Sequence, residues 1–119
     1  MGTLRHAERM AYDEELAHRI REQLQDISGV TEMRMFGGLA FLVGGNMAVA
    51  ASGQSGLMLR VPPDQTEQLA AEPHAGRFEM RGREMNGWLR VDAAGVESDE
   101  DLARWADIGV RYASSLPPK

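Results

Sequence analysis

The stretch Met33-Arg34-Met35-Phe36-Gly37-Gly38-Leu39-Ala40-Phe41-Leu42-Val43 is the most apolar run of the chain and decides its fold. It has one arginine near its start and a glycine pair in its middle. Short apolar runs are typical of buried strands, and glycines within them mark a bend or a tight turn. We therefore expect the core sheet to run from about Thr31 into Val43, with a kink or tight turn at Gly37-Gly38.

Two more strands are predicted directly after this run. Gly44-Gly45-Asn46 is a hairpin turn signal, and it leads into a small apolar strand from Met47 to Ala51. A second turn, residues 52–56, leads into Leu57–Val61, in which Leu57, Leu59 and Val61 share one face. Because each connection is too short for a crossover, we expect these strands to form an antiparallel meander.

The remaining predicted elements are three helices and two strands. A first helix runs from about Asp13 to Ile27 and is ended by Gly29, and a short helix runs from about Asp64 to Glu72. Two strands, near Arg77–Met80 and Gly87–Asp92, are joined by a turn at Arg81–Arg83 and are followed by a final helix. The final helix is the clearest, because Ser98 is followed three residues later by an acid, which is typical of a helix N-cap. Gly109 on its apolar face would let another backbone come close. The order α-β-β-β-α-β-β-α predicts an α+β domain with helices on one face of an antiparallel sheet.

Length and composition predict a single domain. The 119 residues leave room for one hydrophobic core. Residues 1–12 show no clear apolar period and are expected to form a flexible leader, so that the domain comprises residues 13–119. The chain has no cysteine, no signal peptide and no apolar run long enough to cross a bilayer, so we expect a cytoplasmic protein that makes no membrane contact.

Candidate catalytic and ligand-binding residues do not assemble into a recognisable site. The three histidines are scattered, no GxSxG elbow occurs, and neither glycine pair fits a phosphate-binding loop. We therefore predict no catalytic residue, no metal ligand and no cofactor, and we expect that the protein is not an enzyme.

Four arginines near Trp88 give the one patch with the composition of a nucleic-acid site: Arg77, Arg81, Arg83 and Arg90. Arginine beside an aromatic ring suits contact with nucleic acid. Interleaved acids nearly cancel this patch, and the net charge of −5 argues against a standalone nucleic-acid binder. Solvated strand faces and a partner contact both remain open for these arginines. Arg34 differs because it lies in the apolar run, where it is either neutralised inside the fold or marks a partner-binding face.

Methionine is unusually frequent, with eight residues in the chain. Six of them fall in or near the predicted sheet: Met33, Met35, Met47, Met58, Met80 and Met85. Filling of the core is one interpretation, and an adaptable methionine surface for a protein partner is the other.

Five short motifs, in order, resemble the TfoX amino-terminal domain family. They are Met33-Arg34-Met35-Phe36-Gly37-Gly38, Gly45-Asn46-Met47, Leu57-x-Leu59-Arg60-Val61, Gly82-Arg83-x-Met85-x-Gly87-Trp88, and Ser115-Leu116-Pro117-Pro118-Lys119. The resemblance covers about Tyr12 to Lys119. It implies an α+β fold similar to the secretion-chaperone type, and it brings no established enzymatic residues.

The best-known members of this family regulate natural competence together with the cyclic-AMP receptor protein at promoters, and they carry a second, carboxy-terminal helical domain. This chain ends at Lys119 without one, so the resemblance implies a single-domain member. The expected function is protein–protein contact in transcriptional regulation, with a partner that the residues do not identify. A homodimer is also expected, because the edges of a small sheet need covering. The alternatives are direct nucleic-acid binding through the arginine-bearing hairpin and a small-ligand pocket around Arg34 or Arg60.

Overall fold

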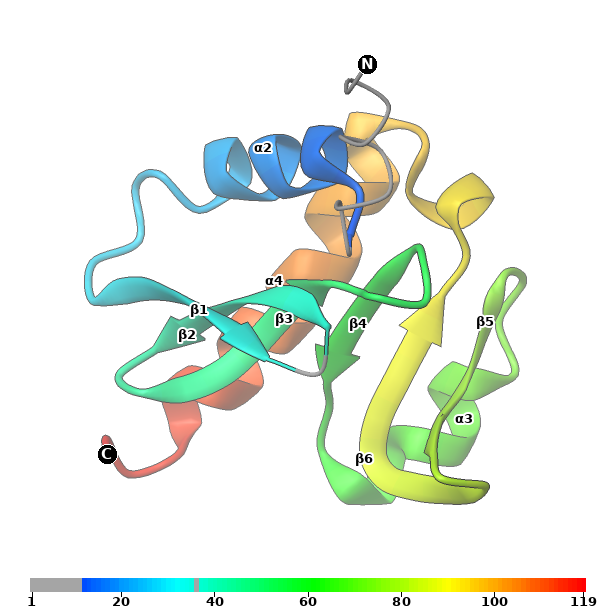
Figure 1. Cartoon of the computed structure of the whole chain (residues 1–119). Coiled ribbons are helices and arrows are strands. Elements are labelled where there is room, and N and C mark those ends of the chain that lie inside the picture. The colour runs from blue at the N-terminus through cyan, green and yellow to red at the C-terminus, as the bar shows by residue number, and fades with distance from the viewer. Residues whose placement is uncertain (1–11, 36) are drawn as a thin grey trace.

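The computed structural model describes residues 12–35 and 37–119 (Figure 1). In chain order the elements are α2 (Glu14–Gln23), β1 (Val30–Met35), β2 (Gly38–Val43), β3 (Asn46–Ala51), β4 (Leu57–Arg60), the 3₁₀ turn η1 (Pro63–Gln65), α3 (Thr66–Ala70), β5 (Ala75–Met80), β6 (Arg83–Val91), the 3₁₀ turn η2 (Ala93–Val96) and α4 (Asp99–Ser115).

The strands form one antiparallel sheet in the order β1-β2-β3-β4-β6-β5, which leaves β1 and β5 as its edges. This confirms the α+β class and the predicted succession of helix, strands, helix, strands and helix. The sheet has six strands rather than the predicted five. The additional strand arises because, of the kink and the tight turn considered at Gly37-Gly38, the structure has the tight turn, so that β1 and β2 are separate, paired strands.

The glycine pair makes that hairpin. Met35 pairs with Gly38, and Gly37 has a positive φ of +77°, which is typical of tight hairpin turns. A Cβ atom on Gly38 would collide with the carbonyl oxygen of Ala51, and one on Gly53 would lie 2.6 Å from the carbonyl oxygen of Gly37. The glycines therefore serve close backbone packing between the β1–β2 turn and the β3–β4 turn.

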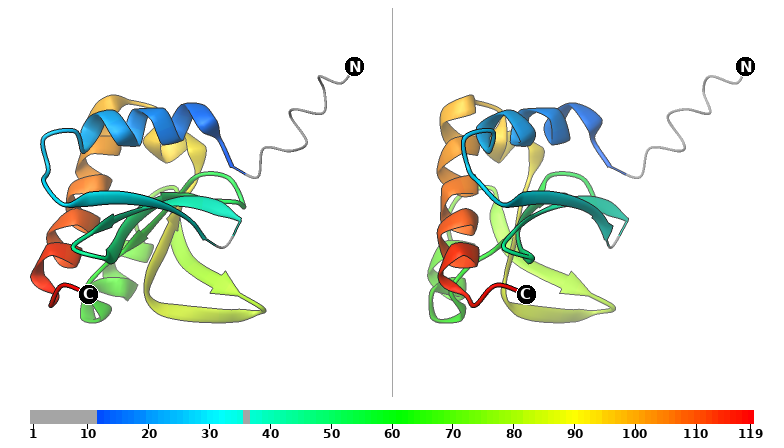
Figure 2. Two further views of the ribbon diagram at one scale, coloured as in Figure 1. Left: turned by 60° about the vertical axis from the view of Figure 1, so that its left-hand side comes forward. Right: turned by 90° about the vertical axis from the view of Figure 1, so that its left-hand side faces the viewer.

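One face of the sheet is covered by helices and holds the larger core. Figure 2 shows α2 and α4 on the same side of the sheet. Apolar side chains of these helices and of α3 join one buried cluster with alternate strand residues, among them Ile20, Leu69, Leu102, Trp105, Phe41, Val49, Leu57, Leu59, Leu89 and Val91. We call this side the helix face.

The predictions for the last helix are confirmed. The Ser98 side chain accepts a hydrogen bond of 3.0 Å from the Asp101 amide, which caps the first turn of α4. Gly109 lies against β3, where a Cβ atom would collide with the carbonyl oxygen of Ala48. The missing side chain thus lets α4 lie directly on the strand.

The prediction for the end of the first helix is wrong. Asp13 caps α2 by accepting hydrogen bonds from the Glu15 and Leu16 amides, but the helix ends at Gln23 and not at Ile27. The following residues form turns that carry the chain to β1, and Ile27 is 37% exposed. The glycine at 29 accordingly lies beyond the helix end, in the approach to the strand.

The predicted leader, residues 1–12, lies outside the described residues except for Tyr12, which packs against the core of the helix face. Across the two described ranges, no helix is both long and apolar enough to cross a membrane.

An ion pair ties α2 to the edge strand β1. Arg21 donates hydrogen bonds of 2.6 and 2.9 Å from Nε and Nη2 to the two carboxylate oxygens of Glu32. The hydrogen bonds from Arg21 hold the pKa of Glu32 below its ordinary value of 4.5, even though partial burial acts in the opposite direction. The same pair raises the pKa of Arg21.

Substitution of Gly109 by alanine tests the contact between α4 and β3. We expect Gly109→Ala to lower the free energy of unfolding by about 1–3 kcal/mol, because the added methyl group forces the helix away from Ala48. Urea unfolding followed by circular dichroism measures this change. Gly76→Ala is the matched control, since a Cβ atom there meets nothing within 4 Å. Equal stability of the two variants would contradict the close contact.

The Arg21–Glu32 pair predicts a small pH dependence of stability. Because the pKa of Glu32 is lowered in the folded protein, the pair stabilises the fold above pH 4.5, and this contribution is lost as the pH falls through the lowered pKa. Glu32→Gln should cost about 0.2–1 kcal/mol at neutral pH, as is usual for solvent-screened pairs. Unfolding measured over a pH series should show the two proteins converging in acid. A constant difference at every pH would contradict this role of Glu32.

Candidate interaction surface

The face of the sheet opposite the helices carries a second apolar cluster made entirely of strand residues. Its buried members are Ala40, Leu42, Met47, Ala50, Met58 and Phe78, and Met35, Met80, Met85 and Trp88 pack against them. Met33 shares this face because it lies directly opposite Ala40 in the sheet. We call these eleven residues the methionine face.

Every methionine in the described ranges belongs to this face: Met33, Met35, Met47, Met58, Met80 and Met85. Met47 and Met58 are only 5% and 3% exposed, so the prediction that methionine fills the core holds for them. Met33, at 53% exposure, lies at the open edge. The face therefore has a packed centre and an accessible, flexible rim, which suits contact with varied apolar surfaces.

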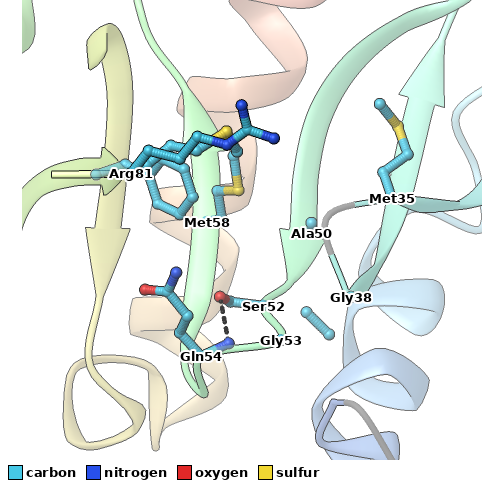
Figure 3. A pocket seen from close by; sticks show the side chains of 11 residues that line it. Met35, Gly38, Ala50, Ser52, Gly53, Gln54, Met58 and Arg81 are labelled. Carbon is cyan, nitrogen blue, oxygen red and sulfur yellow. Dashed lines mark hydrogen bonds between the residues drawn. The ribbon is translucent and has the colours of Figure 1, made fainter. Parts of the chain in front are cut away.

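A hollow of about 250 Å³ opens on the methionine face. Its walls are the end of β1, the β3–β4 turn and the β5–β6 hairpin. Figure 3 shows Met35 and Met58 on opposite sides of it, with the Arg81 side chain extending over Met58. The hollow thus has apolar walls and one charged group at its rim.

The Ser52 hydroxyl and the Gln54 backbone, which border this hollow, are engaged within the fold. Ser52 Oγ accepts a hydrogen bond of 3.0 Å from the Gln54 amide, drawn in Figure 3. The Gln54 carbonyl oxygen accepts one of 2.9 Å from Arg90 Nη2. Arg81 makes no ion pair with any residue that the structure describes. Its guanidinium is accordingly available to an incoming carboxylate.

The structure separates the four arginines that the sequence places together. Arg77 lies opposite Leu89 and so points to the helix face, where its Nε is 3.6 Å from a carboxylate oxygen of Glu84. Arg90 is held by Gln54 and lies 3.6 Å from Asp92. Only Arg81 and Arg83, at the tip of the β5–β6 hairpin, extend into solvent. The four therefore do not form one basic surface, and direct nucleic-acid binding through them stays an unsupported prediction.

Arg34 is exposed and is not neutralised inside the fold. It lies on the edge strand β1, opposite Leu39, and forms no ion pair within the described part of the chain. Of the two roles considered for Arg34, burial with a structural partner is therefore wrong. Its neighbour Phe36 lies outside the described residues.

The other motif residues mostly hold the fold together. The Arg60 guanidinium lies 5.3 Å from the centre of the Trp88 ring and 5.6 Å from that of Tyr112, which links the end of β4 to β6 and α4. Asn46 Nδ2 donates a hydrogen bond of 3.0 Å to the Pro117 carbonyl, so it fastens the end of the chain to the β2–β3 turn. Arg60 does not line the hollow, and this weakens the alternative of a small-ligand pocket around Arg60.

The buried Thr66 holds the backbone at Gly87, next to Trp88. No sequence pattern pointed to this residue. The Thr66 hydroxyl accepts a hydrogen bond of 2.9 Å from the Gly87 amide and donates one of 2.8 Å to the Pro63 carbonyl. Thr66 is fully buried, so both bonds are shielded from water. Its role depends on the docking of α3 against β6, which no local pattern reveals.

Charged side chains do not converge elsewhere in the described ranges. No group of three or more histidine, aspartate or glutamate residues there is placed to hold a metal ion. His18 and Glu22 lie 3.3 Å apart on the outer side of α2, and both are largely exposed. The chemistry that the arrangement offers is therefore apolar contact with a charged rim.

Substitution of Thr66 tests the link between α3 and the motif strand. We expect Thr66→Val to lower the free energy of unfolding by about 1–3 kcal/mol, because it leaves the Gly87 amide buried without an acceptor. Thr66→Ser, which keeps the hydroxyl, should cost clearly less. Chemical unfolding measures both, and a valine variant as stable as the serine variant would contradict this role.

Comparison with known proteins gives one match. A family model described as the TfoX N-terminal domain matches residues 22–113. The matched part begins in α2 and ends in α4, and it therefore includes every strand of the sheet. Neither the curated proteins nor the solved structures gave a match.

Proposed function

This chain belongs to the TfoX N-terminal domain family, and from that premise we propose that it is a non-enzymatic regulatory domain that acts by binding another protein. The binding surface is the methionine face. The ligand is an amphipathic segment of a partner protein that carries apolar side chains flanked by carboxylates. The observation behind this proposal is an apolar sheet face built from strands alone, with a hollow at whose rim Arg81 forms no ion pair with a described residue.

The size of the hollow is compatible with an apolar side chain of a partner. Pockets for small ligands are usually about 300–1,000 Å³, whereas this one is about 250 Å³. Such a volume suits an apolar side chain or two that project from a helix or an extended segment. The surrounding thioethers can adjust to the shape of the incoming group.

The charge of the rim selects the flanking residues of the partner. Arg81 borders the hollow, and Arg83 is exposed next to it in the same hairpin. Carboxylates beside the apolar anchors would meet these guanidinium groups, and a lysine-rich segment would be repelled. Complementary charge of this kind mainly sets specificity and the rate of association.

The setting proposed for this contact is transcriptional regulation, as the resemblance to the TfoX family implies. The proposed mode is recruitment through protein contact rather than through DNA. This agrees with the net charge of −5 and with the separation of Arg77 and Arg90 from the hairpin tip.

Two designed helical peptides with leucine at helical spacing, one flanked by glutamate and the other by lysine, test the proposal. We expect the glutamate peptide to shift the methyl NMR signals of Met35, Met58 and Met80, and the lysine peptide to bind much less. Arg81→Glu should weaken binding about tenfold, because it places like charges together. Arg111→Glu, the same change on the outer side of α4, is the control and should leave binding unaltered.

Binding elsewhere would contradict the proposal. Shifts that avoid the methionine signals, or equal binding of both peptides, would remove the methionine face as the site. A DNA duplex added under the same conditions tests the alternative. Binding of the duplex that falls steeply with salt and is lost in Arg81→Glu would favour nucleic acid instead.

A further inference from the structure

We propose that two copies of this chain pair through their β1 strands, in antiparallel register centred on Met33, so that the two sheets become one. This inference concerns a surface other than the hollow and does not depend on the proposed function. It starts from β1, because this edge strand is open and carries a self-complementary charge pattern.

At the β1 edge of the sheet, the described residues provide no further strand. Thr31, Glu32, Met33 and Arg34 are all exposed, although they belong to a six-residue strand that pairs only with β2. Such an edge offers unpaired backbone groups to another strand. Proteins commonly protect such edges by covering or pairing them, and no described segment covers this one.

The hydrogen-bond pattern fixes which residues face outward. The Gly44 amide donates to the Gly29 carbonyl, so this opposed pair is of the hydrogen-bonded kind. Hydrogen-bonded and non-hydrogen-bonded pairs alternate along an antiparallel ladder. Thr31, Met33 and Met35 therefore bond to β2, and the backbone groups of Val30, Glu32 and Arg34 point away from the sheet.

Charge then selects one register. In a symmetric antiparallel pair, the residues whose backbone N–H and C=O groups point away from the sheet must lie opposite one another in the two copies. This condition is met when the two-fold axis passes through any residue of β1. An axis at Glu32 or at Arg34 opposes two like charges, which is destabilising. An axis at Met33 places Glu32 of each copy opposite Arg34 of the partner subunit, which gives two such pairs. It also pairs nearly the whole strand. An axis at Thr31 pairs fewer residues.

The surroundings of these residues agree with this register. Glu32 and Arg34 lie on the helix face, opposite Phe41 and Leu39, so each Glu32 would lie between Arg21 of its own chain and Arg34 of the partner subunit. Met33, the exposed member of the methionine face, would pack against Met33 of the partner subunit. The two methionine faces would then be continuous across the axis.

Sedimentation equilibrium over a concentration series tests the pairing. We expect the natural chain to form a weak, concentration-dependent dimer, because one strand pair buries a small area. Arg34→Glu alone and Glu32→Arg alone should each weaken dimerisation about tenfold or more, since each places like charges opposite one another. Mixing the two variants should restore dimers, because an acidic strand then faces a basic one. Arg111→Glu is the matched control and should dimerise normally.

Cysteine cross-linking tests the register, and the absence of natural cysteine makes the result unambiguous. Directly opposed residues of a non-hydrogen-bonded pair have Cα atoms about 4.5 Å apart, within the range that a disulfide spans. Met33→Cys should therefore form a covalent dimer on mild oxidation. Thr31→Cys and Met35→Cys should not do so singly, but a mixture of these two should.

Three results would overturn the inference: a monomer at every concentration, a dimer that Arg34→Glu leaves intact, or cross-linking of Thr31→Cys alone. The peptide experiment separates this inference from the proposed function. Arg34→Glu should still bind the glutamate peptide through the hollow, whereas Arg81→Glu should lose the peptide and keep the dimer.

Discussion

The two-sided burial of the central strands is the constraint on which the rest of this structure depends. All residues of β2 and β3 are buried, so apolar groups must be placed on both faces of the sheet. The helices satisfy this requirement on one face only. The other face is closed by its own strand residues, chiefly methionine and aromatic side chains. The methionine face is therefore a direct result of a sheet that has two apolar faces to cover, only one of which is covered by the helices that the structure describes.

Local signals in the sequence predicted much of this fold. The hairpin at Gly44-Gly45, the Ser98 cap and the close approach at Gly109 all follow from short-range chemistry, and all are confirmed. The strand count was one too low, because a glycine pair in an apolar run permits either a kink or a turn, and only pairing with Ala51 and Gly53 decides between them. The end of α2 likewise depends on tertiary structure, because the position of β1 determines where the chain must leave the helix.

The candidate site was less accessible to sequence reasoning. Six methionines near the sheet were evident, but the face they share follows from the register of five strand pairs. Nearness in sequence was misleading for the arginines. Arg77 lies in β5 opposite Leu89 on the helix face, whereas Arg81 lies beyond the end of β5, in a turn with a φ of +56°, and borders the hollow on the other face. Family membership and the apolar sheet face are the two observations on which the proposed function is based.

The position of α4 after all the strands has a consequence for biosynthesis. This helix covers β3 and β4, and the residues after it anchor to the β2–β3 turn through Asn46 and Gly44. Every strand is therefore synthesised before the helix that completes the cover of β3 and β4. Until α4 has been made, the apolar residues that it covers can associate with other chains. Docking of α4 accordingly follows the synthesis of the whole sheet.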